Sequence, residues 1–234
     1  MKIIKPSYKI LTPIDGKQIL KNIELIGRIS HKSESRITET SAAPFVKKLI
    51  ELGDESVLEH ESITVKFICD RGVSHELVRH RIAAYTQEST RYCNYSKDGF
   101  GNELTFIQPC FLHDMTEIHG NFMTIQDTDM PRDKYDLKDA SWLTSMALAE
   151  SLYIFQLNEG LKPEEARSIL PNSLKTEIVC TANLREWRHV LSLRADRKAH
   201  PQMRELMVPL LYELQEKIPV VFDDIAEKIR IQNE

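Results

Sequence analysis

Three arginines and a histidine are concentrated in one short segment of the sequence, residues 79–92. The basic side chains are Arg79, His80, Arg81 and Arg91. A guanidinium presents a planar fork of donors that matches a phosphate or a carboxylate in two-point contacts. The same segment carries the polar side chains Gln87, Ser89 and Thr90, which can hold a phosphate or the edge of a base. The segment therefore predicts a binding site for an anionic ligand.

A second interpretation of Arg79–Arg81 is a solvated basic end of a helix, which the helix dipole favours. If residues 70–82 form one helix, these three side chains point about 100° apart. They would then contact parts of two ligands or two subunits rather than one small anion. The solvated helix end does not account for Ser89 and Arg91 on the following segment.

The elements that position this segment are predicted from hydrophobic period, caps and turn residues. The predicted helices are 17–27, 43–52, 70–82, 136–159, a short one between Pro163 and Pro171, 183–196, and one that starts at Pro201. The predicted strands are 62–69, 89–95, 103–108 and 174–181. Residues 96–140 are expected to include a long loop or insertion. Strands and helices mix without a regular β-α-β rhythm, which favours an α+β fold.

The predicted helix 183–196 places charged residues on two of its faces. Arg185 and His189 are one turn apart and share a face. Arg194 falls on the other side, within an arc of apolar residues. That arc is formed by Trp187, Val190 and Leu191. An arginine there must be paired or must bind a ligand, because an unpaired buried charge is very costly. Two alternatives remain open: the helix ends before Arg194, or Asp196 pairs with it.

Composition excludes several classes of function. The net charge of −4 and the 7% aromatic content give little support to a nucleic-acid or membrane partner. The four cysteines form no C-x-x-C pair, and His75 and His80 lack the spacing of a zinc motif, so no metal site is predicted. We expect a reduced, cytoplasmic protein. Trp142, Phe155 and the methionines of the last helices are expected in the core.

Four segments together resemble one family of enzymes. Residues 79–92 resemble the signature of the flavin-dependent thymidylate synthases, R-H-R followed by seven residues and Ser. In the wider pattern, R-H-R-x-x-S-x-N-x-x-S-x-R-Y, Ala84 and Thr86 replace the usual Ser and Asn. The other matching segments are 53–60 (G-H-x-S/T-x-x-E-H, with Asp54 for His), 166–171 (A-R-x-x-L-P) and 183–194 (N-x-R-x-x-x-H/N-x-x-x-L-R).

The resemblance implies a reaction and an assembly. Such enzymes convert dUMP to dTMP with methylenetetrahydrofolate as the carbon donor. FAD carries the hydride in that reaction, and NADPH re-reduces the flavin. The implied subunit is a single α+β domain with a mostly antiparallel sheet flanked by helices. It assembles as a homotetramer whose FAD sites are shared between subunits.

The resemblance also implies roles for residues at matching positions. The implied FAD contacts are Ser56, Arg79, His80, Arg81, Gln87, Asn183, Arg185 and His189. The implied dUMP contacts are Glu76, Arg79, Gln87, Glu88, Ser89, Thr90, Arg91, Arg167 and Arg194. Arg194 is the implied catalytic residue, since a cation next to N3 of the uracil stabilises the ionised base. Ser89 is expected to bind ligand, because no His-Asp pair that would activate it as a nucleophile is evident.

Two other functions remain open. A non-enzymatic nucleic-acid binder would use the basic segment without a flavin. A flavin- or nucleotide-binding relative that no longer makes dTMP would be consistent with the departures at Ala84 and Thr86. A flavin spectrum of the purified protein excludes the first, and a dTMP-formation assay decides the second.

Overall fold

The computed structural model describes residues 1–95, 103–118 and 134–233. The chain divides into two compact units. The first unit comprises residues 1–7, 67–78 and 86–178, and the second comprises residues 8–66, 79–85 and 179–234. Within the described residues, no helix combines the length and the apolar character needed to cross a bilayer.

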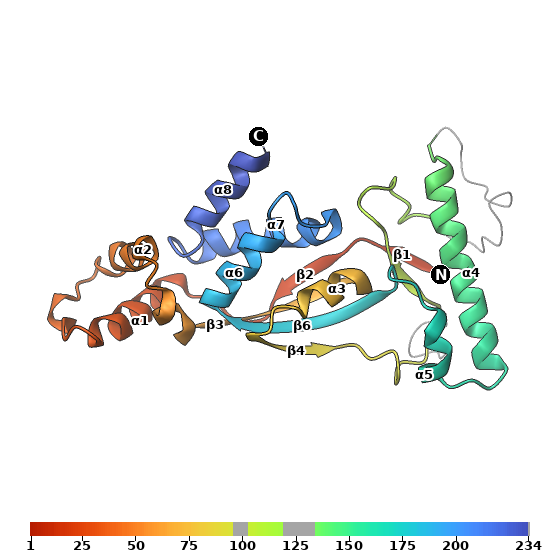
Figure 1. Cartoon of the computed structure of the whole chain (residues 1–234), viewed down its shortest axis with the longest axis horizontal. Coiled ribbons are helices and arrows are strands. Elements are labelled where there is room, and N and C mark those ends of the chain that lie inside the picture. The colour runs from red at the N-terminus through yellow and green to blue at the C-terminus, as the bar shows by residue number, and fades with distance from the viewer. Residues whose placement is uncertain (96–102, 119–133, 234) are drawn as a thin grey trace. The chain divides into compact units, whose positions relative to one another are not determined.

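A four-stranded antiparallel sheet has the strand order β2-β3-β6-β4 (Figure 1). The strands are β2 (Ser7–Ile10), β3 (Ser62–Asp70), β6 (Lys175–Asn183) and β4 (Ala83–Gln87). Alternate side chains of β3 and β6 are buried, as the period of a half-buried strand requires. On the intervening positions the hydroxyls of Thr64 and Thr181 are hydrogen-bonded at 2.9 Å.

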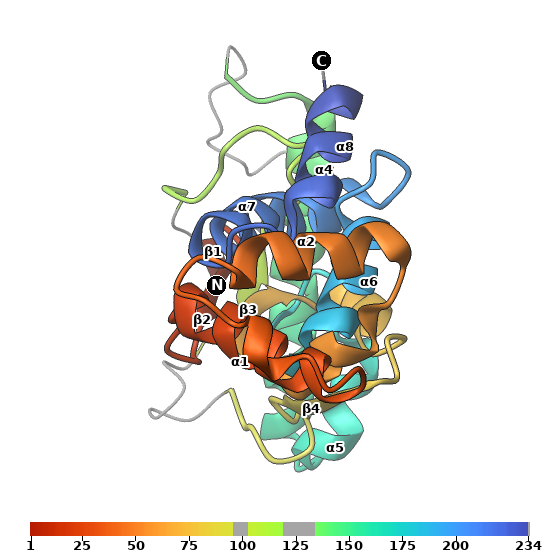
Figure 2. The same ribbon diagram turned by 90° about the vertical axis from the view of Figure 1, so that its left-hand side faces the viewer.

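The second unit is otherwise helical. Its elements are α1 (Gly16–Ile29), η1 (Glu34–Arg36), α2 (Ala42–Leu52), η2 (Glu55–His60), α6 (Leu184–Arg194), α7 (Pro201–Lys217) and α8 (Asp223–Asn233). Helices α1 and α2 pack side by side (Figure 2). Asp15 caps α1, and Gly53 ends α2 in the left-handed region at φ 72°. Gly16 packs so tightly on α7 that an added Cβ would lie 2.0 Å from the carbonyl oxygen of Lys217.

The first unit has its own sheet and cores. Strand β1 (Lys2–Ile4) pairs in parallel with β5 (Thr105–Ile107). The helices are α3 (Arg71–Leu77), α4 (Leu137–Asn158), α5 (Pro163–Ala166) and η4 (Arg167–Ile169). The inner face of α4 contributes Leu143, Met146 and Tyr153 to two apolar clusters. Asp136 and Asp139 form a reciprocal capping box at the start of α4.

Most predicted elements are confirmed, and the α+β fold class with them. The helices expected at 17–27, 43–52, 136–159, 183–196 and after Pro201 are present, as are the strands at 62–69, 103–108 and 174–181. Boundaries shift by a few residues. The expected apolar stripe of α7 is buried throughout: Met203, Leu206, Met207, Leu210, Leu211 and Leu214.

Three predictions around the basic segment and α4 are wrong. The helix predicted over 70–82 ends at Leu77, and the strand predicted over 89–95 lies instead at 83–87. The strand position is set by long-range pairing, as the bond from the amide of Glu88 to the carbonyl of Glu177 shows. Phe155 is 59% exposed rather than in the core.

The loop or insertion predicted over 96–140 lies partly outside the described residues, at 96–102 and 119–133. Its described part contains β5 and the first turn of α4, so that part is not all loop. The sequence predicts a single domain. In the structure the chain divides into two compact units.

Candidate active site

His80 is the inward-facing member of the arginine-histidine-arginine triplet. Its side chain is buried, with 5% of the residue exposed, whereas Arg79 and Arg81 on either side face outward. The triplet lies in the turn between α3 and β4, not on a helix. The hydroxyl of Tyr85 in β4 donates to the carbonyl oxygen of His80 at 2.9 Å and fixes this turn. The turn therefore separates the three basic side chains into one buried imidazole and two exposed guanidiniums.

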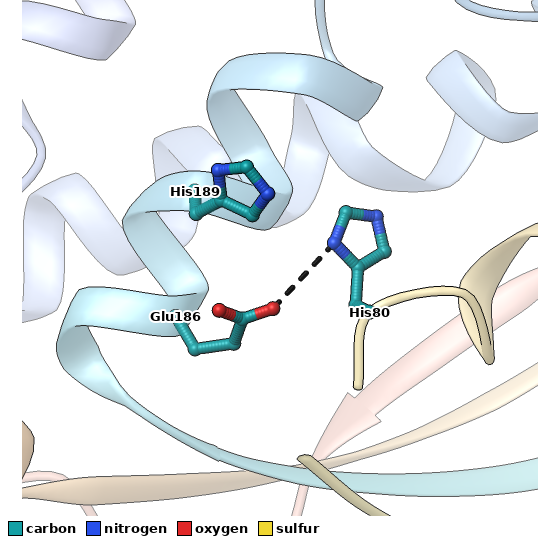
Figure 3. A group of neighbouring side chains, drawn as sticks. All are labelled: His80, Glu186 and His189. Atoms are coloured by element: carbon teal, nitrogen blue, oxygen red, sulfur yellow. Dashed lines mark ion pairs between the residues drawn. The ribbon is translucent and has the colours of Figure 1, made fainter. Parts of the chain in front are cut away.

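The buried imidazole of His80 lies against Glu186 and His189 of α6 (Figure 3), and Arg194 of the same helix also contacts it. The Nε of Arg194 donates to Nε2 of His80 at 2.9 Å. On the other side of the ring, Nδ1 of His80 lies 3.6 Å from a carboxylate oxygen of Glu186. The ring of His189 meets that of His80 edge-on, with 5.5 Å between centroids. Arg194 thus has the partner that the buried-charge argument required.

The surroundings of His80 hold it neutral. Burial, helped by the positive charges of Arg194 and His189, lowers its pKa to about 4. An Nε–H donor needs a lone pair on the imidazole nitrogen that it meets, so Nε2 carries no proton. The proton of the neutral ring is therefore on Nδ1, facing Glu186. Burial raises the pKa of Glu186 above its ordinary value, an effect that His189 partly offsets.

Two cavities of the second unit meet at this cluster. The larger, about 580 Å³, is lined by Glu55, Glu59, Ile82, Asn183, Arg185, Glu186, Arg188, His189, Ser192, Asp224 and Ile225. The other, about 410 Å³, is lined by Arg79, His80, Arg81, Ile82, Glu186, His189, Leu193 and Arg194. They share Ile82, Glu186 and His189 as lining residues. The structure thus gathers six predicted FAD contacts and the predicted catalytic arginine around adjoining hollows.

The two arginines of the larger cavity have different surroundings. Arg185 is exposed and pairs with Glu59 of η2 at 2.6 Å. Arg188 is buried and pairs with Glu55 of η2 and with Asp224 of α8 in a two-point contact. Arg188 therefore ties three elements together, whereas Arg185 faces the opening. Ser56, another predicted FAD contact, is exposed on η2, and its hydroxyl donates to Asp54 at 3.4 Å.

A second group of predicted residues lies in the first unit. The side-chain amide of Gln87 donates to the hydroxyls of Ser74 and Thr176, at 2.9 and 3.1 Å. The carboxylate of Glu88 accepts from Tyr95, from the ammonium of Lys175 and from the amide of Glu177, at 2.9 to 3.1 Å. These bonds fix the end of β4 before any ligand arrives.

The rest of this group frames a short turn. Ser89 and the buried Thr90 follow Glu88, and the Ser89 hydroxyl accepts from the amide of Arg91 at 3.3 Å. A guanidinium nitrogen of Arg167 donates to the Thr90 hydroxyl at 3.3 Å. Arg91 is half-exposed and lies 3.7 Å from a carboxylate oxygen of Glu164. Glu76 lies on α3 in the same unit. The guanidiniums of Arg91 and Arg167 thus lie at a turn that carries two side-chain hydroxyls, and such a set of donors can bind a phosphate.

Comparison with known proteins identifies the family. A family model described as "Thymidylate synthase complementing protein" matches residues 15–220. The flavin-dependent thymidylate synthase of Pyrococcus furiosus is 34% identical over 205 residues, which cover 87% of this chain and 73% of that protein. The chain belongs to the flavin-dependent thymidylate synthase family. The counterpart in Mycobacterium avium is 31% identical, covering 94% of this chain and 84% of its own length.

Solved structures agree on the fold. The UMP/dUMP methylase PolB from Streptomyces cacaoi, bound with 5-Br dUMP, has a TM-score of 0.74 at 21% identity and covers 99% of this chain and 100% of its own. Thymidylate synthase X from Helicobacter pylori, with FAD and dUMP, has a TM-score of 0.70 at 21% identity. That match covers 95% of this chain and 99% of the other. The prediction of a flavin-dependent thymidylate synthase, a methyltransferase, is confirmed at the level of the family.

The flavin that gives the family its name fits the donor set of the larger cavity. FAD carries a diphosphate, and Arg185 and His189 supply donors on one face of α6, as their spacing predicted. The amide of Asn183 lies at the start of the same helix, where its side chain caps the amide of Glu186 at 2.8 Å. Glu59 holds Arg185 now and would share it with the anion.

A metal ion fits the same cluster poorly. His80, Glu186 and His189 present ligand atoms within 4.8 Å of one another. However, Nε2 of His80 accepts from Arg194, and Nδ1 must then carry the proton. A metal on Nδ1 would need an ionised imidazole or the loss of Arg194. The second candidate set, His113, Asp136 and Asp139, is engaged in capping α4. The absence of a metal in this family member stays a prediction.

The sequence did not predict two residues that contact the candidate site residues. Lys175 neutralises Glu88, and Glu186 faces His80. The backbone amide of Glu186 donates to the capping side chain of Asn183 at 2.8 Å. The side chain turns inward instead. Its spacing of three residues from His189 on the helix was the available signal.

Proposed function

We propose that this chain catalyses the reductive methylation of dUMP to dTMP. Methylenetetrahydrofolate supplies the carbon, FAD carries the hydride, NADPH is the reductant, and tetrahydrofolate is the second product. Membership of the family supports the reaction. The single structural observation that carries it is the bond between Arg194 and a neutral His80, which aims a guanidinium into a cavity lined by predicted flavin contacts.

Arg194 acts on the pyrimidine. A fixed guanidinium beside N3 stabilises the ionised uracil, and the negative charge makes C5 a better nucleophile. His80 cannot compete for that role, since its lowered pKa leaves it uncharged near neutral pH. The guanidinium of Arg194, rather than the imidazole of His80, is therefore the positive charge that acts on the base.

We assign to the remaining predicted residues the binding and orientation of FAD and the nucleotide. FAD, when bound, supplies the redox chemistry of the reaction. The donors Arg79, Arg81, Asn183, Arg185 and His189 hold it in the second unit. In the first unit the turn from Gln87 to Arg91, together with Arg167, holds the nucleotide phosphate, and Glu76 faces the nucleotide. Ser56 makes a further contact with FAD.

Three of the four cysteines are poorly suited to act as a nucleophile, and the fourth, Cys110, is exposed and lies in no segment that matches the family pattern. Burial raises the pKa of Cys69 to about 12 and that of Cys180 to about 11. Burial also raises the pKa of Cys93. A thiol attacks as thiolate, so these three are poorly prepared for covalent catalysis. This supports a scheme in which the base is activated by charge rather than by an enzyme thiol.

Replacing Arg194 tests the mechanism. In Arg194→Ala we expect kcat for dTMP formation to fall roughly 100-fold or more, the cost of removing one preorganised charge from a transition state. FAD binding should persist, because Arg185 and His189 remain. The measurement is anaerobic turnover of dUMP with NADPH and methylenetetrahydrofolate, alongside the flavin spectrum. The exposed Arg197→Ala is the matched control. Full activity in Arg194→Ala would remove this residue from the mechanism.

The same assay on the wild-type chain decides between the two remaining functions. Formation of dTMP supports the proposal. A flavin spectrum without dTMP would identify a flavin- or nucleotide-binding relative, with Ala84 and Thr86 of β4 as the first substitutions to reverse. We further propose a cytoplasmic homotetramer that shares its FAD sites between subunits and takes neither nucleic acid nor membrane as a partner.

A further inference from the structure

Glu186 is a buried carboxylate within the candidate active site. It is 7% exposed, lies on the inner side of α6, and directs an oxygen toward Nδ1 of His80 (Figure 3). Burying a carboxylate is unfavourable unless a donor compensates it. Its position lies between the matched positions of the family pattern, at one of the unspecified residues between Arg185 and His189. The role of this acid is therefore not given by the resemblance.

The imidazole of His80 can satisfy both neighbours in one protonation state. With the proton on Nδ1, the N–H points toward the Glu186 carboxylate 3.6 Å away, an electrostatic contact, and the ring accepts from Arg194 at 2.9 Å. With the proton on Nε2, it would oppose the Nε–H of Arg194, and a lone pair on Nδ1 would face the carboxylate. The second arrangement is repulsive at both ends of the ring. Which nitrogen carries the proton of a histidine is commonly set by the partner of the other nitrogen.

We propose that Glu186 is a positioning residue, whose carboxylate selects the Nδ1–H form of His80 and thereby keeps Nε2 available to orient Arg194. The role of the oriented guanidinium rests on the proposed function. The selection of the imidazole form does not. Glu186 also lines both cavities, and its role in this scheme is exerted through His80.

An ion pair between Glu186 and a charged His80 is the competing arrangement. A doubly protonated ring has no lone pair for Arg194, so that pair would displace the guanidinium. The hydrogen bond between Arg194 and Nε2 therefore favours the neutral ring. His189 also faces Glu186 and His80 from the exposed side of α6, and its ring meets that of His80 edge-on.

Two variants of similar size distinguish the effect of the side-chain oxygen at position 186 from the effect of the side-chain volume. Glu186→Met fills the same space, suits a helix and has no oxygen acceptor. Glu186→Gln keeps a carbonyl oxygen that can accept from Nδ1. Both are prepared as FAD-loaded enzyme with ¹⁵N-labelled histidine, and His80 is assigned by the signal missing in His80→Gln. The imidazole ¹⁵N shifts then report which nitrogen carries the proton.

The wild type and Glu186→Gln should show Nε2 as the acceptor nitrogen. Glu186→Met should show a mixture of ring forms or the proton on Nε2. The value of kcat should fall by up to roughly tenfold in Glu186→Met, because the carboxylate 3.6 Å from Nδ1 no longer favours the Nδ1–H form electrostatically. In Glu186→Gln it should stay within about threefold, because the acceptor remains. FAD affinity should be equal in the two variants, because both lack the charge of Glu186 beside the cavity, and Glu216→Ala, an exposed glutamate on α7, is the control.

The inference is overturned if Glu186→Met keeps the wild-type ring form, or if Glu186→Gln loses as much activity as Glu186→Met. A misfolded Glu186→Met is recognised by its lost flavin spectrum, and Glu186→Ala then replaces it in the same comparison. If the wild type makes no dTMP, the proposed function fails while the ¹⁵N shifts still test the selection of the ring form. The two failures are therefore distinguishable.

Discussion

The neutral state of His80 has a consequence for stability at the residue level. Its pKa of about 4 in the folded chain lies below the ordinary value of 6.5. The unfolded chain therefore takes up the proton first as pH falls. The stability that depends on the neutral ring is full above pH 6.5 and is lost progressively between pH 6.5 and 4.

This pH dependence can be measured by urea unfolding. Between pH 7 and pH 5 the contribution of His80 to the free energy of unfolding should fall by roughly 1–2 kcal/mol, allowing for partial solvent screening. In His80→Gln, which cannot titrate, that part of the loss should disappear. An equal pH dependence in both proteins would show that folding does not lower the pKa of His80.

For single residues, the sequence predicted correctly that Arg194 has a partner, because the cost of an unpaired buried charge was sufficient to decide it. An arginine in the apolar arc of a helix must have a partner, and Arg194 has one. The identity of the partner was not predictable, because His80 lies 114 positions away and its inward orientation depends on the turn after α3. Asp196, the alternative partner considered, pairs with Lys228 instead.

At the level of elements, α6 carries two neighbouring arginines with different roles. Arg188 is buried between η2 and α8, whereas Arg185 lies at the opening of the same cavity. Removing one partner of a buried ion pair leaves uncompensated charge, while an exposed pair contributes little. The two side chains therefore separate stability from ligand binding on a single helix.

Matched substitutions test this division. Arg188→Met should lower the free energy of unfolding by about 2–3 kcal/mol, somewhat less than a fully buried pair because Glu55 and Asp224 are partly exposed. Arg185→Met should leave stability unchanged within error but weaken FAD binding. Urea unfolding of the flavin-free chains and flavin titration provide the two measurements. Loss of stability in Arg185→Met would contradict the assignment.

The elements with strong local signals were predictable, and those set by pairing were not. Helix α4 has a capping box and was placed within two residues, and α7 has an apolar stripe and begins at the predicted Pro201. Strand β4 has the sequence Ala-Ala-Tyr-Thr-Gln, which no local rule separates from the end of a helix. Its position depends on β6, far away in sequence.

At the level of the whole molecule, the predicted site residues fall into two groups, one in each compact unit. The second unit holds all the predicted flavin contacts except Gln87, and the first holds most of the predicted nucleotide contacts around Glu88. The mixed order of helices and strands was sufficient to predict the α+β class. The division into units was not predictable, because each unit is assembled from segments distant in sequence.

The proposed sharing of FAD sites between subunits can be tested by mixing inactive chains. If Arg79 of one subunit and Arg185 of another hold the same FAD, chains with Arg79→Ala and Arg185→Ala should each be inactive. Co-expressed, they should regain part of the activity, because some sites then receive both arginines. The oligomer should have about four times the 27.1 kDa mass of the chain by light scattering. Absence of recovery in mixed oligomers would contradict shared sites.

The close approach of Gly16 to α7 has a practical consequence for anyone engineering this enzyme. Propensity scales rank alanine above glycine in a helix by about 1 kcal/mol, so heat-tolerance designs would replace this residue early. Here the methyl group would meet the carbonyl oxygen of Lys217 at 2.0 Å, well inside van der Waals contact. The helix end would have to be pushed away, so the substitution that looks safest on paper would loosen the enzyme instead.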